Sequence, residues 1–183
     1  MEKRYEDYAY ILDYLIRARS RAAQYRVGTQ AQVIGDRFFT LLEVIVKKNL
    51  NLKPLDRIYV GKDIRKEVTY IIGRIGYAEL TTTAKMELEV AIEKIALKHE
   101  KQFIEFFNTA QPITLRMHAL ELIPGIGKKY MWQILDERDK TLFRNFADLK
   151  QRANIPTPQK LIVKRILEEL TGESRERLFV RPE

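Results

Sequence analysis

Short runs of apolar, β-branched and aromatic residues, separated by charged and turn-forming residues, fill the first 80 positions, and eight of the nine tyrosines lie there. This pattern is typical of β-strands. We predict four strands, over Tyr8–Leu15, Arg37–Lys47, Asp56–Lys62 and Val68–Ile75. Strands this short favour a small closed or partly open barrel, because an open sheet would leave longer unpaired edges.

After Leu80 the apolar positions recur with the 3.6-residue period of an α-helix. Thr81 to Thr83 offer an N-cap hydroxyl, and Gln111-Pro112 stops the pattern because the residue before a proline avoids the α region. We therefore predict one long helix from Ala84 to about Asn108. From residue 114 onward only helices are predicted, over Thr114–Leu122, Lys128–Glu137, Phe146–Arg152 and Gln159–Leu170.

The charge balance favours a polyanionic partner. The chain carries 33 Lys and Arg against 25 Asp and Glu, a net charge of +8 and a pI near 9.6. Each lysine or arginine placed on a phosphate releases condensed counterions, so nucleic acid is the first candidate. The excess lies at both ends, since residues 81–111 carry 4 basic and 5 acidic residues.

The composition also excludes several classes of site and location. Cysteine is absent and only His99 and His118 are present, which excludes disulfides, a thiol nucleophile, an iron–sulfur cluster and an ordinary structural zinc site. No stretch approaches the roughly 18 apolar residues of a membrane span, and the first residues lack the apolar core of a signal peptide. We expect a cytoplasmic protein with no membrane partner.

The segment Leu120–Lys129 carries the clearest chemistry. Pro124 and Gly125 are expected to end a helix and turn the chain, while Ile126 points inward. A second helix then begins at Lys128, and its unpaired N–H groups and positive dipole end suit a phosphate. Such a contact grips a backbone without reading its sequence.

This segment resembles the helix-hairpin-helix motif of DNA- and RNA-binding proteins over about 25 residues. The resemblance implies a phosphate site at Gly125, Ile126, Gly127, Lys128 and Lys129, which we call the first hairpin together with Pro124. It also implies a monovalent cation held by the hairpin carbonyls; we expect no other cofactor and no other metal. Met131 departs from the small alanine usual in the motif, where the two helices approach closely.

A second hairpin, Pro156–Leu161, repeats the outline of the first without its glycines. Thr157 and Pro158 stand where Gly125 and Ile126 stand in the first. We predict that the second hairpin packs against the first as a structural partner and does not hold phosphate.

Nearly the whole chain resembles an archaeal family of predicted nucleic-acid-binding proteins, the domain of unknown function 655 family. The residues that carry this resemblance are Tyr8–Leu15, Phe38–Val44, Ile58–Lys62 and the segment from Glu105 through Lys129. The resemblance implies an archaeal cytoplasmic protein in which a small OB-like barrel is joined to the helical module. The family's function is itself unassigned.

The predicted fold class is therefore α+β. A small OB-like β-barrel domain occupies residues 1–80, a connecting helix residues 81–111, and an all-α tandem helix-hairpin-helix domain residues 112–183.

The barrel offers a second set of candidate nucleic-acid-binding residues. No acidic residue lies between Asp13 and Asp36, and this stretch, predicted as a basic mobile arm, contains Arg17, Arg19, Arg21 and Arg26. In an OB-type barrel such a connection borders the binding face, where aromatic side chains stack on bases. Arg57, Tyr59 and Tyr70 are the candidates on the strands. The alternative is that the tyrosines fill the barrel and the arginines form a solvated loop.

We expect no enzyme and no catalytic residue. The carboxylates of Asp136, Glu137 and Asp139 alternate with Arg138 and Lys140, as at a solvated helix end, and no phosphate-binding Gly-x-x-x-x-Gly-Lys-Ser/Thr loop is present. The sequence therefore predicts a non-catalytic nucleic-acid-binding protein, for RNA more than DNA because unpaired regions suit a stacking platform. The alternatives are a protein-interaction adaptor that docks through the helical module and, behind it, a nucleic-acid-processing enzyme.

Overall fold

The structure is a computed structural model that describes residues 5–15, 29–48 and 50–180. The chain has an α+β fold, as predicted, and divides into two compact units. The first comprises Met1–Ala91 with Leu170–Glu183, and the second comprises Ile92–Glu169. The domain boundaries at residues 80 and 111 stay a prediction.

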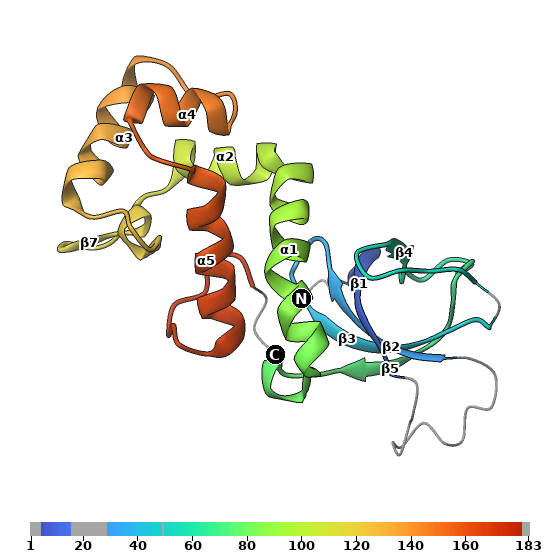
Figure 1. Ribbon diagram of the computed structural model, residues 1–183. Helices are drawn as coiled ribbons and strands as arrows, with labels where there is room; N and C mark the ends of the chain where they lie inside the picture. Colours follow the sequence, from blue (N-terminus) through green and yellow to red (C-terminus); the bar gives the residue numbers. More distant parts are fainter. Residues whose placement is uncertain (1–4, 16–28, 49, 181–183) are drawn as a thin grey trace. The chain divides into compact units, whose positions relative to one another are not determined.

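The first unit contains a curled, five-stranded antiparallel sheet (Figure 1). Its strands are β1 (Tyr8–Leu15), β2 (Thr29–Gly35), β3 (Leu41–Val46), β4 (Arg57–Tyr59) and β5 (Val68–Arg74). Their order is β4-β1-β2-β3-β5, so β4 and β5 are the two edges. Alternate residues face the concave side and form one apolar cluster that includes Ile11, Val33, Val44 and Ile58.

Strand β2 corrects the prediction of a basic arm that reaches Asp36. Residues Thr29–Gly35 pair with both β1 and β3. Gln32 is 1% exposed, and its side-chain amide donates to Glu43 Oε1 (3.2 Å) and to the Glu79 carbonyl (3.0 Å). The glutamines indicated a polar loop, whereas in the structure the Gln32 amide is bonded inside the fold. The four arginines of the predicted arm, Arg17, Arg19, Arg21 and Arg26, lie outside the described residues.

The strand predicted over Arg37–Lys47 begins only at Leu41, because a turn precedes it. The buried carboxylate of Glu6 accepts the backbone N–H groups of Arg37, Phe38 and Thr40, each at 3.0 Å. Burial raises the pKa of Glu6, and the three amides oppose that shift. This carboxylate holds the turn before β3 in place.

The predicted long helix is two helices, α1 (Thr82–Lys98) and α2 (Glu100–Thr109), after a short 3-10 turn, η2 (Tyr77–Glu79). Thr81 is the predicted N-cap, since its hydroxyl accepts the Ala84 N–H at 3.0 Å. The single helix is wrong because the backbone leaves helical geometry at His99, with φ −106° and ψ 29°. Glu100, the first residue of α2, then accepts the Phe146 N–H at 2.7 Å.

The second unit also contains a two-stranded ribbon, a 3-10 turn and three helices. These are β6 (Pro112–Thr114), β7 (Met117–His118), η3 (Ala119–Leu122), α3 (Lys128–Lys140), α4 (Phe146–Ala153) and α5 (Pro158–Thr171). The last three helices confirm the prediction to within three residues at each end. None of the helices in the described ranges is both long and apolar enough to cross a bilayer.

The helix predicted over Thr114–Leu122 is wrong. The segment instead forms the β6–β7 ribbon and the single turn η3. His118 caps η3, since its Nδ1 accepts the Leu120 N–H at 3.1 Å, and Glu121 Oε2 accepts the His118 N–H at 2.9 Å. This reciprocal cap stabilises a short turn where the apolar spacing had indicated a helix.

Candidate nucleic-acid interface

The first hairpin is anchored on both sides by buried isoleucines. Ile123 and Ile126 are 1% and 3% exposed, and the Ile126 N–H donates to the Ile123 carbonyl at 2.9 Å. Gly125 between them has φ +89°, a left-handed conformation that side chains rarely adopt. A Cβ at Gly125 would lie 3.3 Å from Leu161 Cδ2 of α5. The packing of Ile123, Ile126 and Leu161 therefore fixes the shape of the turn, while Gly125 itself is exposed.

The outer side of the first hairpin presents backbone N–H groups. Helix α3 begins at Lys128, with Gly127 as its N-cap and no side-chain cap. Within the described ranges, the N–H groups of Gly127, Lys128, Lys129 and Tyr130 have no hydrogen-bond acceptor. Gly127 is exposed, and a Cβ there would meet no atom within 4 Å. The geometry leaves room for an anion to approach the start of α3, where the helix dipole is positive.

The two hairpin lysines differ in their surroundings. Lys128 Nζ lies 3.2 Å from Glu121 Oε1 and also donates to the Arg116 carbonyl at 3.3 Å. The His118 amide, and then Lys128, hold the pKa of Glu121 below its usual value. Lys129 is exposed and has no ion pair with any described residue. Of the two lysines, Lys129 therefore supplies the uncompensated charge at this site.

Sequence reasoning missed two exposed residues beside the first hairpin. Arg116 lies at the tip of the β6–β7 ribbon, and its carbonyl contacts Lys128. Trp132, the chain's one tryptophan, is 59% exposed on α3. It follows Lys128 by four residues and Lys129 by three, so all three share a helix face. That spacing could have identified Trp132, whereas the wrong helix prediction concealed Arg116.

The second hairpin has the same outline and a more closed backbone. Ile155 is fully buried, like Ile123, and Thr157 has φ +45° where Gly125 has φ +89°. Pro158 has no N–H group, and the Lys160 N–H already donates to the Thr157 carbonyl at 3.0 Å. The second hairpin therefore offers fewer N–H groups to a ligand than the first hairpin.

Helix α5 joins the second hairpin to the first. The buried Arg165 donates to the Leu122 carbonyl at 3.0 Å and to Glu169 Oε1 at 2.8 Å. With the Leu161 contact to Gly125, these bonds support the expected role of the second hairpin as a structural partner.

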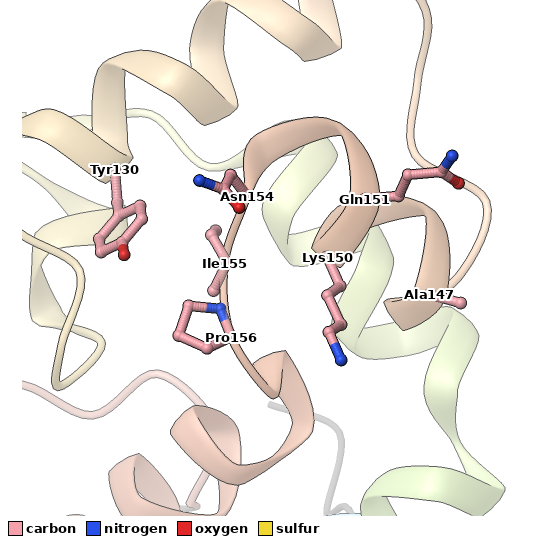
Figure 2. A pocket seen from close by; sticks show the side chains of 7 residues that line it. All are labelled: Tyr130, Ala147, Lys150, Gln151, Asn154, Ile155 and Pro156. Atoms are coloured by element: carbon pink, nitrogen blue, oxygen red, sulfur yellow. The ribbon is translucent and has the colours of Figure 1, made fainter.

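A cavity of about 500 Å³ lies between the start of α3, helix α4 and the turn before α5 (Figure 2). Figure 2 shows Tyr130 on one side and Asn154 and Pro156 on the other, with Lys150 beyond the turn. Asn154 ends α4 in a left-handed conformation with φ 52°, which asparagine tolerates. Polar and apolar side chains thus flank the first turn of α3.

The barrel candidates belong to the first unit, where Arg57 and Tyr59 contact neighbouring side chains. Arg57 forms an ion pair with Asp36 at 2.8 Å and lies 3.5 Å from the ring centroid of Tyr8. The Tyr59 hydroxyl donates to Asp63 Oδ2 at 3.1 Å. Tyr70, on β5, is 43% exposed. Arg57 and Tyr59 thus already stabilise the barrel, and a nucleic-acid role for all three stays a prediction.

The acidic residues near the end of α3 do not converge. Asp136 and Asp139 are exposed, while Glu137 contacts Lys140 and Arg152, and the Lys140 ammonium lowers the pKa of Glu137. Across the described ranges, no three His, Asp or Glu side chains group closely enough to hold a metal ion.

Comparison with known proteins identifies relatives over almost the whole length. The family described as "Protein of unknown function (DUF655)" matches residues 5–181. The uncharacterized protein MJ0038 of Methanocaldococcus jannaschii is 35% identical over 178 residues, which are 97% of this chain and 80% of that protein. The crystal structure of Af1531 from Archaeoglobus fulgidus has 44% sequence identity and a TM-score of 0.86, covering 96% of this chain and all of that one. This chain therefore belongs to the DUF655 family, whose matched members have no described function.

Proposed function

We propose that this protein is a non-catalytic nucleic-acid-binding protein that grips a sugar-phosphate backbone at the first hairpin. The observation that carries the proposal is the run of N–H groups from Gly127 to Tyr130, at residues that are exposed or partly exposed, which has no acceptor in the described part of the chain. Buried N–H groups are almost always paired, and exposed ones at a helix start are ready donors to an anion.

Gly127 supports the proposal in a way that Gly125 does not. The backbone at Gly127 is extended, with φ −88° and ψ −175°, so any residue could adopt it. No neighbouring atom lies within 4 Å of its Cβ position, so packing does not require glycine either. What a glycine provides there is access, because a phosphate oxygen can approach the N–H groups without meeting a side chain.

The neighbouring side chains favour a strand with unpaired bases. Lys129 and the exposed Arg116 suit phosphate, and the exposed ring of Trp132 suits stacking on a base. A duplex would keep its bases away from this ring. We therefore propose RNA over DNA, since RNA more often presents unpaired loops and ends.

The architecture proposed with this function is an OB-like barrel followed by a tandem helix-hairpin-helix module. The pairing of β1 with β4 and of β3 with β5 fits a partly open five-stranded barrel. The paired positions of the two hairpins fit a tandem module, although a single 3-10 turn replaces the first helix of the first hairpin. We also propose that the first-hairpin carbonyls hold a monovalent cation when phosphate binds. A cytoplasmic location stays a prediction.

Binding to fluorescent single- and double-stranded RNA and DNA at low salt tests the proposal. Wild-type protein should bind and lose affinity steeply as salt rises. Gly127→Asp should weaken binding several-fold or more, because its carboxylate repels the phosphate. Gly127→Ala should weaken binding less than Gly127→Asp, because its methyl group narrows the approach without adding a charge. Gln159→Asp, the same charge at the equivalent position of the second hairpin, is the matched control and should have a smaller effect.

The adaptor remains the second candidate, because the β6–β7 ribbon exposes apolar side chains. Ile113 and Met117 are more than 40% exposed and Leu115 is fully exposed. Exposed apolar groups of this kind are frequent at protein–protein contacts. If no RNA or DNA binds at low salt, the proposed function is wrong and the adaptor replaces it.

A further inference from the structure

The barrel of the first unit is open along one side. Its sheet begins with β4 and ends with β5, and these two edge strands are not paired with each other. A cavity of about 400 Å³ is lined by residues of β5 and by Val60, Gly61 and Lys62, which directly follow β4. Leu42, Val60 and Ile71, which contact the apolar interior, form its floor. The cavity is thus an exposed part of the barrel interior.

Arg74 of β5 faces this cavity, because it pairs with Leu42, a residue of the apolar floor. Ile71 pairs with Val44 of the apolar cluster and therefore lies on the same face. Gly73 pairs with Glu43, which lies on the opposite face and contacts Gln32, so Gly73 borders the cavity with its backbone.

Three cationic side chains line the same cavity. They are Lys62, Arg65 and Arg74, and none of them has a carboxylate partner among the described residues. Arg65 is oriented by its Nε, which donates to the Gly61 carbonyl at 2.7 Å. Lys62 Nζ lies 4.6 Å from the ring centroid of Tyr5, which also lines the cavity.

The cavity contains a single acidic residue, which does not offset these charges. Glu6 is 6% exposed, and its carboxylate is directed to the N–H groups of Arg37, Phe38 and Thr40. The accessible side of the cavity is therefore cationic above an apolar floor.

We propose that this cavity binds a nucleoside monophosphate unit, either as a free nucleotide or as the terminal nucleotide of a strand. Arginine forks and a lysine are well suited to a dianionic phosphate. The apolar floor and the ring of Tyr5 give a planar base two surfaces for stacking. A volume of about 400 Å³ is within the range of small-ligand sites. The site lies in the first unit and does not depend on the first hairpin.

Isothermal titration calorimetry of the full chain with AMP, GMP, CMP and UMP, each tested separately, examines this proposal. At least one nucleotide should bind with 1:1 stoichiometry. It should bind about tenfold more tightly than inorganic phosphate or the matching nucleoside, because the cations and the floor act together. Arg74→Glu should reverse one of the cavity's positive charges and weaken binding by about tenfold or more. Lys66→Glu, the same charge change at an exposed residue that does not line the cavity, is the matched control and should retain most of the affinity.

The proposal is wrong if no nucleotide shows saturable binding at millimolar concentration, or if Arg74→Glu, folded by circular dichroism, binds like the wild type. It is also wrong if inorganic phosphate binds as tightly as every nucleotide. Short oligonucleotides with a 5′- or 3′-phosphate, tested on Gly127→Asp, distinguish a strand end from a free nucleotide. Gly127→Asp should leave mononucleotide binding unchanged, so failure of this site and failure of the first hairpin have different signatures.

Discussion

The two hairpins of the second unit share a backbone outline and differ in what they leave open. Both place a buried isoleucine before a proline, and both have a left-handed residue next, Gly125 in the first and Thr157 in the second. The first then continues with Gly127 and unpaired N–H groups, whereas the second continues with a proline and a bonded N–H. We propose that the same turn serves as a contact surface in the first hairpin and as support in the second.

The supporting role of the second hairpin follows from the helix that it starts. Helix α5 places Leu161 against Gly125 and Arg165 against the Leu122 carbonyl, on either side of the first turn. A rigid hairpin lowers the entropy lost when a ligand binds. We therefore attribute ligand contact to the first hairpin and its positioning to the second.

The largest expected effect is on the link between the hairpins. Arg165→Met should destabilise the protein by about 3–5 kcal/mol, because it removes the guanidinium that contacts the carboxylate of Glu169, which is 1% exposed. Urea denaturation measures the loss. Replacing both partners, Arg165→Met with Glu169→Leu, should recover most of it. Lys164→Met, at an exposed neighbouring residue, is the control. Equal urea midpoints for Arg165→Met and Lys164→Met would contradict the claim that Arg165 links the two hairpins.

Exchanging residues at the left-handed positions sharpens the comparison further. Gly125→Ala should cost about 1–2 kcal/mol, since a Cβ disfavours this backbone and meets Leu161. Thr157→Gly should have the opposite sign, with a gain of about 1 kcal/mol or less after the greater freedom of glycine in the unfolded chain is subtracted. Thermal unfolding of both variants tests this; a loss of stability in Thr157→Gly would contradict the strain inferred at that residue.

A smaller effect should separate the two lysines of the first hairpin. Lys129→Ala should weaken nucleic-acid binding and reduce the slope of log K against log salt by about one, as expected for one lost phosphate contact. The double variant Lys128→Ala with Glu121→Gln removes an ion pair without changing the net charge, so its slope should stay near the wild-type value. Anisotropy titrations at several salt concentrations give both slopes. Equal salt slopes for the two variants would contradict the difference inferred between Lys128 and Lys129.

The smallest effect should appear as a pH dependence of stability. Burial, and then Arg138, lower the pKa of His118 from its usual 6.5, so the folded state favours the neutral ring that caps η3. The stability that the neutral His118 ring contributes is present above pH 6.5. It is lost as the pH falls from 6.5 through the lowered pKa of His118. His118→Asn keeps an acceptor for the Leu120 N–H without titrating. Thermal unfolding between pH 5 and pH 7 should therefore show a flatter profile in the variant, and identical profiles would contradict the cap.

Local patterns in the sequence predicted much of the fold. Strands β1, β4 and β5, the Thr81 cap and helices α3 to α5 follow from alternation, capping residues and helical period. Strand β2 did not, because the signal for burying Gln32 lies in partners 11 and 49 residues away, Glu43 and Thr81. The break at His99 likewise leaves no local signal such as proline or glycine.

The first hairpin could be located from the sequence, since proline and glycine spacing fix its turn. The charge pattern of the first hairpin could not be predicted, because the pairing of Lys128 with Glu121 depends on η3 replacing the predicted helix. The cavity lined by Arg74 could not be predicted from the sequence either, since its lining residues are spread from Tyr5 to Arg74 and only the folded sheet brings them together.

An amide NMR titration with a short single-stranded RNA reports on the phosphate contact itself. If the N–H groups at the start of α3 receive a phosphate, the signals of Gly127, Lys128 and Lys129 should shift most and saturate together. Shifts confined to other residues, with these three signals unmoved at saturation, would contradict the assignment of the first hairpin as the contact.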